Sequence, residues 1–226
     1  MRKTLMGASI VGVACLALAS LAYGAAQVAF TASVNPNKAN KPAGLKIKLV
    51  SSDPAAPQPP IMDRITIKLN AGGKYNGSKF PKCSLNALNQ KGPKGCPSKS
   101  KIGSGTGVGY ARPVVTDPVQ AKLTIFNGGN SILVYVFPDL GPTFVVTCNI
   151  TGGYNLSCAI PPIKTLPSAP DAAVGAVSTK VGVKKKGKLG MLVTPKKCKG
   201  SWKYTAKFSF TTGETVTAPG TQKCKK

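Results

Sequence analysis

The stretch W-K-Y-T-A-K-F-S-F, Trp202 to Phe210, carries the clearest strand pattern of this sequence. Its apolar residues share one parity: Trp202, Tyr204, Ala206, Phe208 and Phe210. Side chains alternate between the two faces of a β-strand, so the stretch predicts an aromatic face in the core and a cationic face in water. Aromatic residues near lysines can also stack nucleic-acid bases. We favour core packing, because a fold of this size needs large inward side chains and the chain has few other aromatic residues.

A second stretch, K-I-G-S-G-T-G-V-G-Y from Lys101 to Tyr110, has glycine at every second position. It is not a dinucleotide fingerprint, because Val108 and Tyr110 stand where G-x-G-x-x-G requires glycine, and the Walker pattern is absent. A period of two instead predicts a strand with one bare face. Glycine in a strand marks a bulge or a close approach by other backbone or by an aromatic ring.

Short apolar or alternating runs, separated by glycine, proline or asparagine, fill most of the remaining chain. Their spacing of about 8 to 12 residues is typical of antiparallel sheets, so we expect an all-β fold, an antiparallel β-sandwich of about 9–11 strands. The runs outside the two stretches above are 28–34, 45–50, 65–69, 119–126, 132–137, 143–150, 154–160, 173–183 and 188–193. One short helix is expected at residues 84–91, with Ser84 as its cap and Gly92-Pro93 as its stop.

The cysteines beyond Cys15 fall into three local pairs. An even number of cysteines in an exported chain predicts disulfides and an oxidising compartment. The predicted bridges are Cys83–Cys96, Cys148–Cys158 and Cys198–Cys224. A zinc site is disfavoured, because the chain has no histidine and no C-x-x-C spacing. We therefore expect no metal and no cofactor.

The N-terminus has the outline of a signal peptide over residues 1–24. Arg2 and Lys3 precede an apolar run and small residues, which predicts cleavage after Gly24 or Ala26. Retention of this segment as a membrane anchor is the alternative, because a membrane span needs roughly 20 apolar residues. Residues 25–226 are expected to form a single disulfide-stapled β-sandwich domain. Two small β subdomains with a break near 111–118 are the alternative.

Several motifs resemble those of uncharacterised exported all-β proteins of actinobacteria, a group without an assigned activity. The motifs are K-F-P-K-C-S-L-N-A-L at 79–88, G-C-P-S-K-S-K-I-G-S-G-T-G at 95–107, F-N-G-G at 126–129, I-P-P at 160–162 and P-K-K-C-K-G-S-W-K-Y at 195–204. The resemblance covers most of the chain after residue 24 and implies secretion and a β fold, without catalytic residues. The run K-K-K-G-K at 184–188 is more basic than this group leads us to expect.

The charge balance is strongly basic, with 31 lysines and arginines against 6 acidic residues. Nearly all the basic residues are lysine, and since bidentate recognition of phosphate or bases favours arginine, specific nucleic-acid readout is disfavoured. Lysine density is highest near the C-terminus and predicts a polyanion-binding surface there: Lys184, Lys185, Lys186, Lys188, Lys196, Lys197, Lys199, Lys203 and Lys207. The alternative, without a binding function, is that these lysines only maintain solubility and keep sheet edges from pairing with other chains.

These features predict a non-catalytic, secreted or cell-envelope-associated structural or adhesive protein that binds an anionic cell-wall polymer or polysaccharide. A carbohydrate- or ligand-binding module is the alternative, and exposure of Trp202 or Tyr110 on a groove would favour it. An enzyme would need a serine–lysine pair such as Ser98-Lys99 or Ser100-Lys101, because histidine is missing and carboxylates are scattered singly. We expect no enzymatic activity and no membrane contact unless the N-terminal segment is retained.

Overall fold

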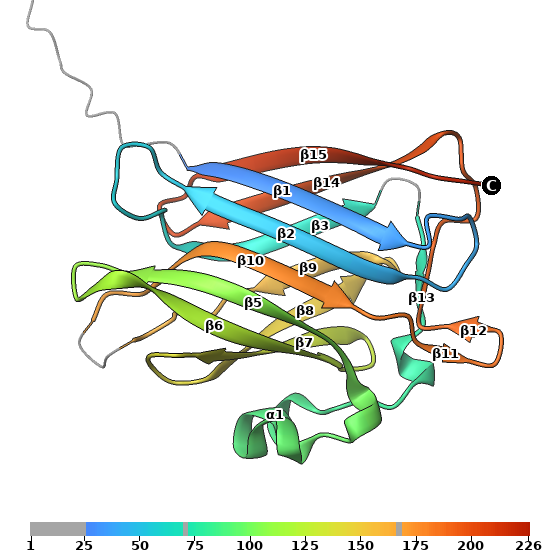
Figure 1. The fold of residues 1–226 in the computed structure, drawn as a ribbon, viewed down its shortest axis with the longest axis horizontal. Helices are drawn as coiled ribbons and strands as arrows, with labels where there is room; N and C mark the ends of the chain where they lie inside the picture. The colour runs from blue at the N-terminus through green and yellow to red at the C-terminus, as the bar shows by residue number, and fades with distance from the viewer. Residues whose placement is uncertain (1–25, 70–71, 166–168) are drawn as a thin grey trace, which may run out of the picture.

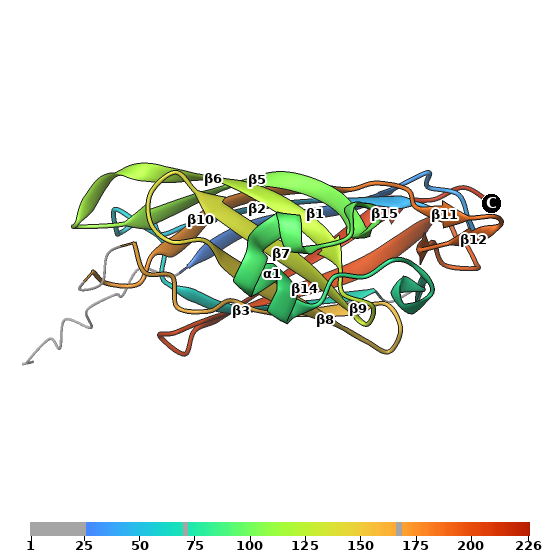
Figure 2. The ribbon, with the colours of Figure 1, turned by 90° about the horizontal axis from the view of Figure 1, so that it is seen from below.

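One 11-stranded sheet makes up most of the protein (Figures 1 and 2). The computed structural model describes residues 26–69, 72–165 and 169–226. The strand order is β1-β2-β10-β5-β6-β7-β8-β9-β3-β14-β15, and every pair of neighbours is antiparallel. The antiparallel all-β prediction is confirmed. The two layers expected of a sandwich are halves of this single sheet, which curls until it is nearly closed like a barrel.

The strands of the main sheet are short at the β8–β9 side and longest at β5 and β6. Their bounds are β1 Gln27–Asn35, β2 Gly44–Ser52, β3 Met62–Leu69, β5 Lys101–Ala111, β6 Val115–Asn127, β7 Ser131–Pro138, β8 Phe144–Thr151, β9 Asn155–Ala159, β10 Ala173–Val181, β14 Ser201–Phe210 and β15 Thr215–Lys223. Two small ladders complete the structure: β11 (Lys185–Lys186) with β12 (Leu189–Gly190), and β4 (Lys74–Tyr75) with β13 (Leu192–Val193).

Residues 111–118, where we considered a break between subdomains, form the hairpin that joins β5 to β6 within this sheet. The signal-peptide prediction for residues 1–24 lies outside the described residues.

The predicted helix is confirmed as α1 (Leu85–Lys91), and it lies outside the sheet (Figure 2). The Ser84 hydroxyl accepts a hydrogen bond from the Ala87 amide at 3.1 Å, which caps the helix as expected. Gly92 ends it with a φ of 61°. Leu88 of this helix is fully buried against Phe126 and Leu133, so α1 covers part of the outer face of β6 and β7. Three single-turn 3-10 helices flank it: η1 (Gly77–Lys79), η2 (Gly92–Gly95) and η3 (Ser98–Ser100).

All three predicted disulfides are present, with the predicted partners. Cys83–Cys96 holds the α1 region, Cys148–Cys158 joins opposite residues of the β8–β9 hairpin, and Cys198–Cys224 ties the C-terminus to the loop before β14. Disulfides persist in oxidising compartments, so they indicate an extracytoplasmic setting.

The glycine stretch forms β5, as predicted, and its bare face permits the close approach that we expected. A Cβ atom at Gly103 or Gly105 would collide with the carbonyl oxygens of Lys180 and Ser178 on the neighbouring strand β10. Only glycine fits at these two positions without moving backbone.

The prediction differs from the structure in several strands, and the two-residue strands β4 and β11 lie outside the predicted runs. The run 188–193 is divided between β12 and β13, in two separate ladders. The strand β15 was not predicted, because Pro219 and Gly220 resemble turn residues. Proline is tolerated on an edge strand, where its missing amide removes no ladder hydrogen bond.

Candidate functional site

The charged residues of this protein are separated along the strand direction. All six acidic residues lie at one end of the sheet, where β1, β3, β6, β10 and β15 begin and where β2 and β7 end (left in Figure 1). They are Asp53, Asp63, Asp117, Asp139, Asp171 and Glu214. Arg64, Arg112 and Lys164 lie among them. We call this the acidic end.

The opposite end of the sheet, right in Figure 1, is formed by loops whose sequences contain many lysines. We define the lysine end by Lys38, Lys41, Lys184, Lys185, Lys186, Lys188, Lys196, Lys197, Lys199, Lys225 and Lys226. No carboxylate side chain accompanies them, since the six acidic residues of the chain are all at the acidic end. β14 spans 10 residues between the two ends, or about 30 Å. That distance exceeds the screening length of about 8 Å at physiological salt, so the acidic end does not neutralise the lysines.

Loops from three parts of the chain form the lysine end, and they are bound to one another. The Thr194 hydroxyl donates to the Lys38 carbonyl at 2.6 Å and accepts from the Lys41 amide at 2.9 Å. The Asn40 amide donates to the Pro195 carbonyl at 3.0 Å. Thr194 is buried, so these hydrogen bonds hold the lysine-bearing loops in fixed relative positions.

The C-terminus joins the same assembly. The Lys225 amide donates to the Asn37 carbonyl at 2.8 Å, and the Ala39 amide donates to the Lys225 carbonyl at 2.9 Å. Trp202 is buried, and its indole nitrogen donates to the Lys197 carbonyl at 2.9 Å. The strand β14 therefore positions a lysine-bearing loop through its first aromatic residue, Trp202.

The predicted polyanion surface is brought together in part. The lysines of 184–188 and 196–199 lie at the lysine end, β11 and β12 forming a projecting hairpin that includes several of them (Figure 1). Lys203 lies near that end on β14, whereas Lys207 lies halfway along the same strand. Sequence reasoning missed Lys38 and Lys41, which line a shallow depression together with Lys185. No local signal marks these two, because their loop meets residue 185 only through the fold.

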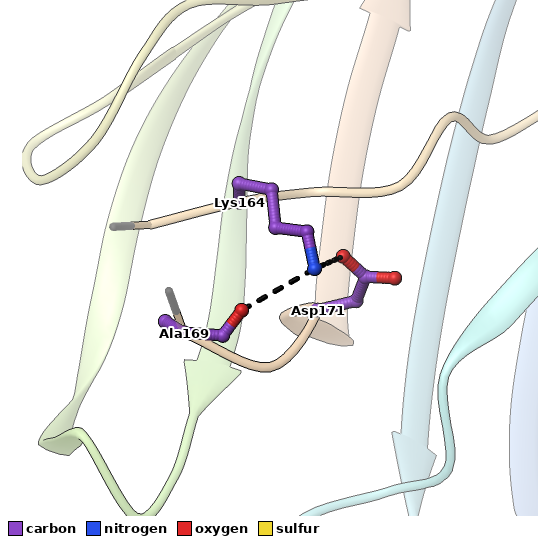
Figure 3. A network of polar contacts seen from close by, with 3 residues as sticks. All are labelled: Lys164, Ala169 and Asp171. Carbon is purple, nitrogen blue, oxygen red and sulfur yellow. Dashed lines mark hydrogen bonds and ion pairs between the residues drawn. The ribbon is translucent and has the colours of Figure 1, made fainter. Parts of the chain in front are cut away.

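Among the described residues, the acidic end contains an ion pair just before the start of β10. Lys164 Nζ lies 2.9 Å from Asp171 Oδ1 and donates to the Ala169 carbonyl at 3.3 Å (Figure 3). The Lys164 side chain is 50% exposed and that of Asp171 27%. An ion pair of this exposure contributes little stability, about 0–1 kcal/mol. It therefore serves mainly to fix the residues that precede β10.

The serine and aromatic side chains considered for catalysis or sugar binding take part in the packing of the fold. The Ser100 hydroxyl is buried and donates to the Pro97 carbonyl at 2.6 Å, while Lys99 and Lys101 are exposed. The buried Trp202 offers no stacking surface, and the ring of Tyr110 packs against Gly175. Within residues 26–69, 72–165 and 169–226 no cluster of three potential metal ligands occurs, and no helix there is long and apolar enough to span a membrane.

A buried polar contact links Tyr75 to Asn127 and includes no lysine. Asn127 is fully buried, and its amide nitrogen donates to the carbonyls of Gly77 and Pro81 at 2.9 and 2.8 Å. Its oxygen accepts from the Tyr75 hydroxyl at 2.8 Å. Burial raises the pKa of Tyr75 well above its ordinary value, because the phenolate would lose its hydration. This pair joins η1 to the end of β6 and has no exposed reactive group.

Comparison of the chain with protein-family models, with curated proteins and with solved structures finds no match.

Proposed function

We propose that this protein is a non-catalytic, extracytoplasmic component of the cell envelope that binds an anionic envelope polymer through its lysine end. The separation of all six acidic residues from the lysine end carries the proposal. Lysines that served only solubility would be as effective when interspersed with carboxylates over the whole surface. Here the lysines gather where no acidic side chain offsets them, and such a surface attracts a polyanion.

The chemistry of the lysine end favours a flexible polymer over a sequence-specific nucleic acid. The two arginines after the N-terminal segment, Arg64 and Arg112, are both at the acidic end. Lysine is a compact point charge without the planar fork that recognises phosphate or bases in a bidentate manner. A row of lysines therefore fits repeated phosphate or carboxylate groups whose spacing varies.

The secreted setting rests on three disulfides together with the predicted signal peptide. The resemblance of the sequence to exported actinobacterial proteins also agrees with a secreted setting. In the envelope, phosphate- and carboxylate-bearing polymers are the polyanions within reach.

Sedimentation with isolated envelope fragments tests the proposal. The protein should co-sediment at about 0.02 M salt and remain in solution at about 0.5 M, because screening weakens exposed charge contacts. The variant Lys185→Gln/Lys186→Gln/Lys188→Gln should bind about tenfold more weakly, given about 0.5 kcal/mol for each exposed contact.

The matched control removes the same charge elsewhere. Lys48→Gln/Lys122→Gln/Lys207→Gln changes exposed lysines on the outer faces of β2, β6 and β14, away from the lysine end. It should bind within about twofold of the wild type. Equal loss in both triple variants would show that net charge alone drives retention and would refute a localised site.

A further inference from the structure

Free space runs through the interior of the curled sheet, between its two layers. A larger cavity of about 200 Å³ and a smaller one of about 90 Å³ adjoin there. They share lining side chains: Leu45, Ile47, Ile67, Ile132 and Leu156. The smaller cavity extends toward Tyr75 and Leu192 near the lysine end, and the larger one extends to Leu140 at the acidic end. Together they form an elongated space parallel to the strands.

The lining of the larger cavity is almost entirely aliphatic. Ile65, Val134, Val146 and Val177 line it, yet each is only partly buried, because their surfaces face the free space. The charged side chain in this lining, Lys164, lies at the acidic end. By contrast, the other part of the interior is filled by aromatic rings, with Phe30 and Phe208 at 5.5 Å between centroids.

Water is a poor occupant for such a space. An ordered buried water needs roughly 10–15 Å³ and two to four polar partners, and the aliphatic part of the lining supplies none. A cavity of about 200 Å³ is also far larger than the voids of an ordinary close-packed interior. Its composition, apolar with a polar group at one end, matches that of sites that enclose an apolar ligand.

The bare face of β5 helps to make this space. Gly107 and Gly109 line the larger cavity. A Cβ atom at Gly107 would find only ordinary contacts, at 3.7 Å from the Ala176 carbonyl oxygen and 3.8 Å from side-chain atoms of Ala121 and Leu123. Backbone does not require glycine there, unlike at Gly103 and Gly105. Glycine at position 107 instead leaves this part of the cavity empty, because it has no side chain to fill it.

We propose that this interior space binds a single aliphatic chain, with the polar end of the ligand beside Lys164 at the acidic end. The elongated shape fits a chain better than a ring system. Leu140, which lines the cavity, is 42% exposed, so the space reaches the surface beside it. Lys164, which lines the cavity at that end, supplies a polar partner for a hydroxyl or carboxyl group. This site is separate from the lysine end and does not depend on polymer binding.

Titration of the purified protein with 1-alkanols of increasing length tests the proposal. Burial of each further methylene should raise the affinity about fourfold until the space is filled, over chains of about 8 to about 14 carbons. Calorimetry measures the affinities. An affinity that does not change with chain length, or no binding by any alkanol, would overturn the proposal.

A space-filling variant locates the site. Gly107→Leu places a side chain in the larger cavity and should weaken binding of dodecanol about 10- to 50-fold, since it displaces two or three methylenes. Gly182→Leu is the matched control, because Gly182 lines neither cavity and its added Cβ would lie 3.7 Å from the nearest atom, the Ile102 carbonyl oxygen. It should bind as the wild type does.

A second cavity-filling variant keeps the test informative if Gly107→Leu does not fold. Ala121→Leu projects into the same space from β6, opposite Gly107 in the ladder. It should weaken binding as Gly107→Leu does. Unchanged dodecanol affinity in a folded Gly107→Leu or Ala121→Leu protein would show that the alkanol binds elsewhere and would refute the proposal.

Discussion

Gln222 on β15 and Val34 on β1 form hydrogen bonds in both directions. The Val34 amide donates to Gln222 Oε1 at 2.8 Å, and Gln222 Nε2 donates to the Val34 carbonyl oxygen at 2.8 Å. The side-chain amide thus takes the place of a peptide group on a neighbouring strand. Since β1 and β15 are the two edges of the sheet, this contact helps to close it.

Two further side chains, those of Glu214 and Tyr204, accept hydrogen bonds along the same seam. The Ala26 amide donates to Glu214 Oε1 at 3.0 Å, and both this pair and Val34–Gln222 are 188 residues apart. The strands therefore run parallel across the seam. The Ala32 amide donates to the Tyr204 hydroxyl at 2.9 Å. Side chains satisfy these edge amides, which would otherwise be open to pairing with another chain.

Gln222→Ala should lower the free energy of unfolding by about 1–2 kcal/mol, because it removes two hydrogen bonds of a partly buried main chain. Urea denaturation measures the change. Gln120→Ala on the exposed face of β6 is the control and should stay within about 0.5 kcal/mol of the wild type. A Gln222→Ala protein as stable as the control would mean that the seam closes without this contact.

The buried pair of Tyr75 and Asn127 predicts a specific loss of stability in alkali. The pKa of Tyr75 is raised in the folded state by burial, so its stabilising effect is complete below the unfolded-state pKa of about 10. The effect declines as the pH rises above that value toward the folded-state pKa, because the unfolded chain then ionises and the folded one does not. A phenylalanine in place of Tyr75 has no ionisable hydroxyl, so its contribution to stability would not change over this pH range.

Tyr75→Phe should therefore destabilise the protein by about 1 kcal/mol near neutral pH, through loss of the hydrogen bond to Asn127. The stability advantage of the wild type should fall by about 1.4 kcal/mol as the pH rises from about 9 to about 11, so that Tyr75→Phe becomes about as stable as the wild type or slightly more stable. Urea denaturation at a series of pH values measures both proteins. A difference that stays constant over that range would contradict the assigned burial of Tyr75.

Features that depend on local spacing could be predicted from the sequence. The alternation from Trp202 to Phe210 gives the burial of β14, in which all five aromatic and alanine positions of that parity are buried. Ser84 and Gly92 give the bounds of α1. The short separations of the cysteines give the disulfide partners, since nearby strands or turns bring such pairs together.

Features that depend on how the sheet curls could not be predicted. The acidic residues stand singly in the sequence, and their common end follows only once strand directions and the order of β3, β10 and β15 are known. Lys38 meets Lys225 through an isolated parallel bridge over 187 positions of the sequence. The bare face of β5 was predicted, but whether each glycine meets the backbone of the neighbouring strand β10 or free space depends on how the sheet curls.

The opening of the aliphatic site and the lysine end lie at opposite ends of the molecule, so the two proposed sites are compatible. A polymer bound at the lysine end leaves the acidic end, with the exposed Leu140, facing away from it. Acidic residues around that end also repel the polyanion and so discourage binding in the reverse orientation. An aliphatic ligand could therefore enter while the protein remains attached to the envelope.

The disulfide Cys198–Cys224 ties the C-terminus to a lysine-bearing loop, and its removal should affect polymer binding as well as stability. The double variant Cys198→Ser/Cys224→Ser opens a loop with a sequence separation of 26 and should lose about 3 kcal/mol of stability. It should also bind envelope fragments more weakly, because lysines that are no longer held together lose more conformational entropy on binding.

Cys148→Ser/Cys158→Ser is the control for this prediction. That bridge lies within the β8–β9 hairpin, away from the lysine end, and closes a loop with a separation of 10. Its removal should cost a similar stability, about 3 kcal/mol, without changing the affinity for envelope fragments. Sedimentation of both folded double variants at low salt compares them. If the two bind alike, the fixed arrangement of loops at the lysine end is not what the polymer recognises, and only its charge matters.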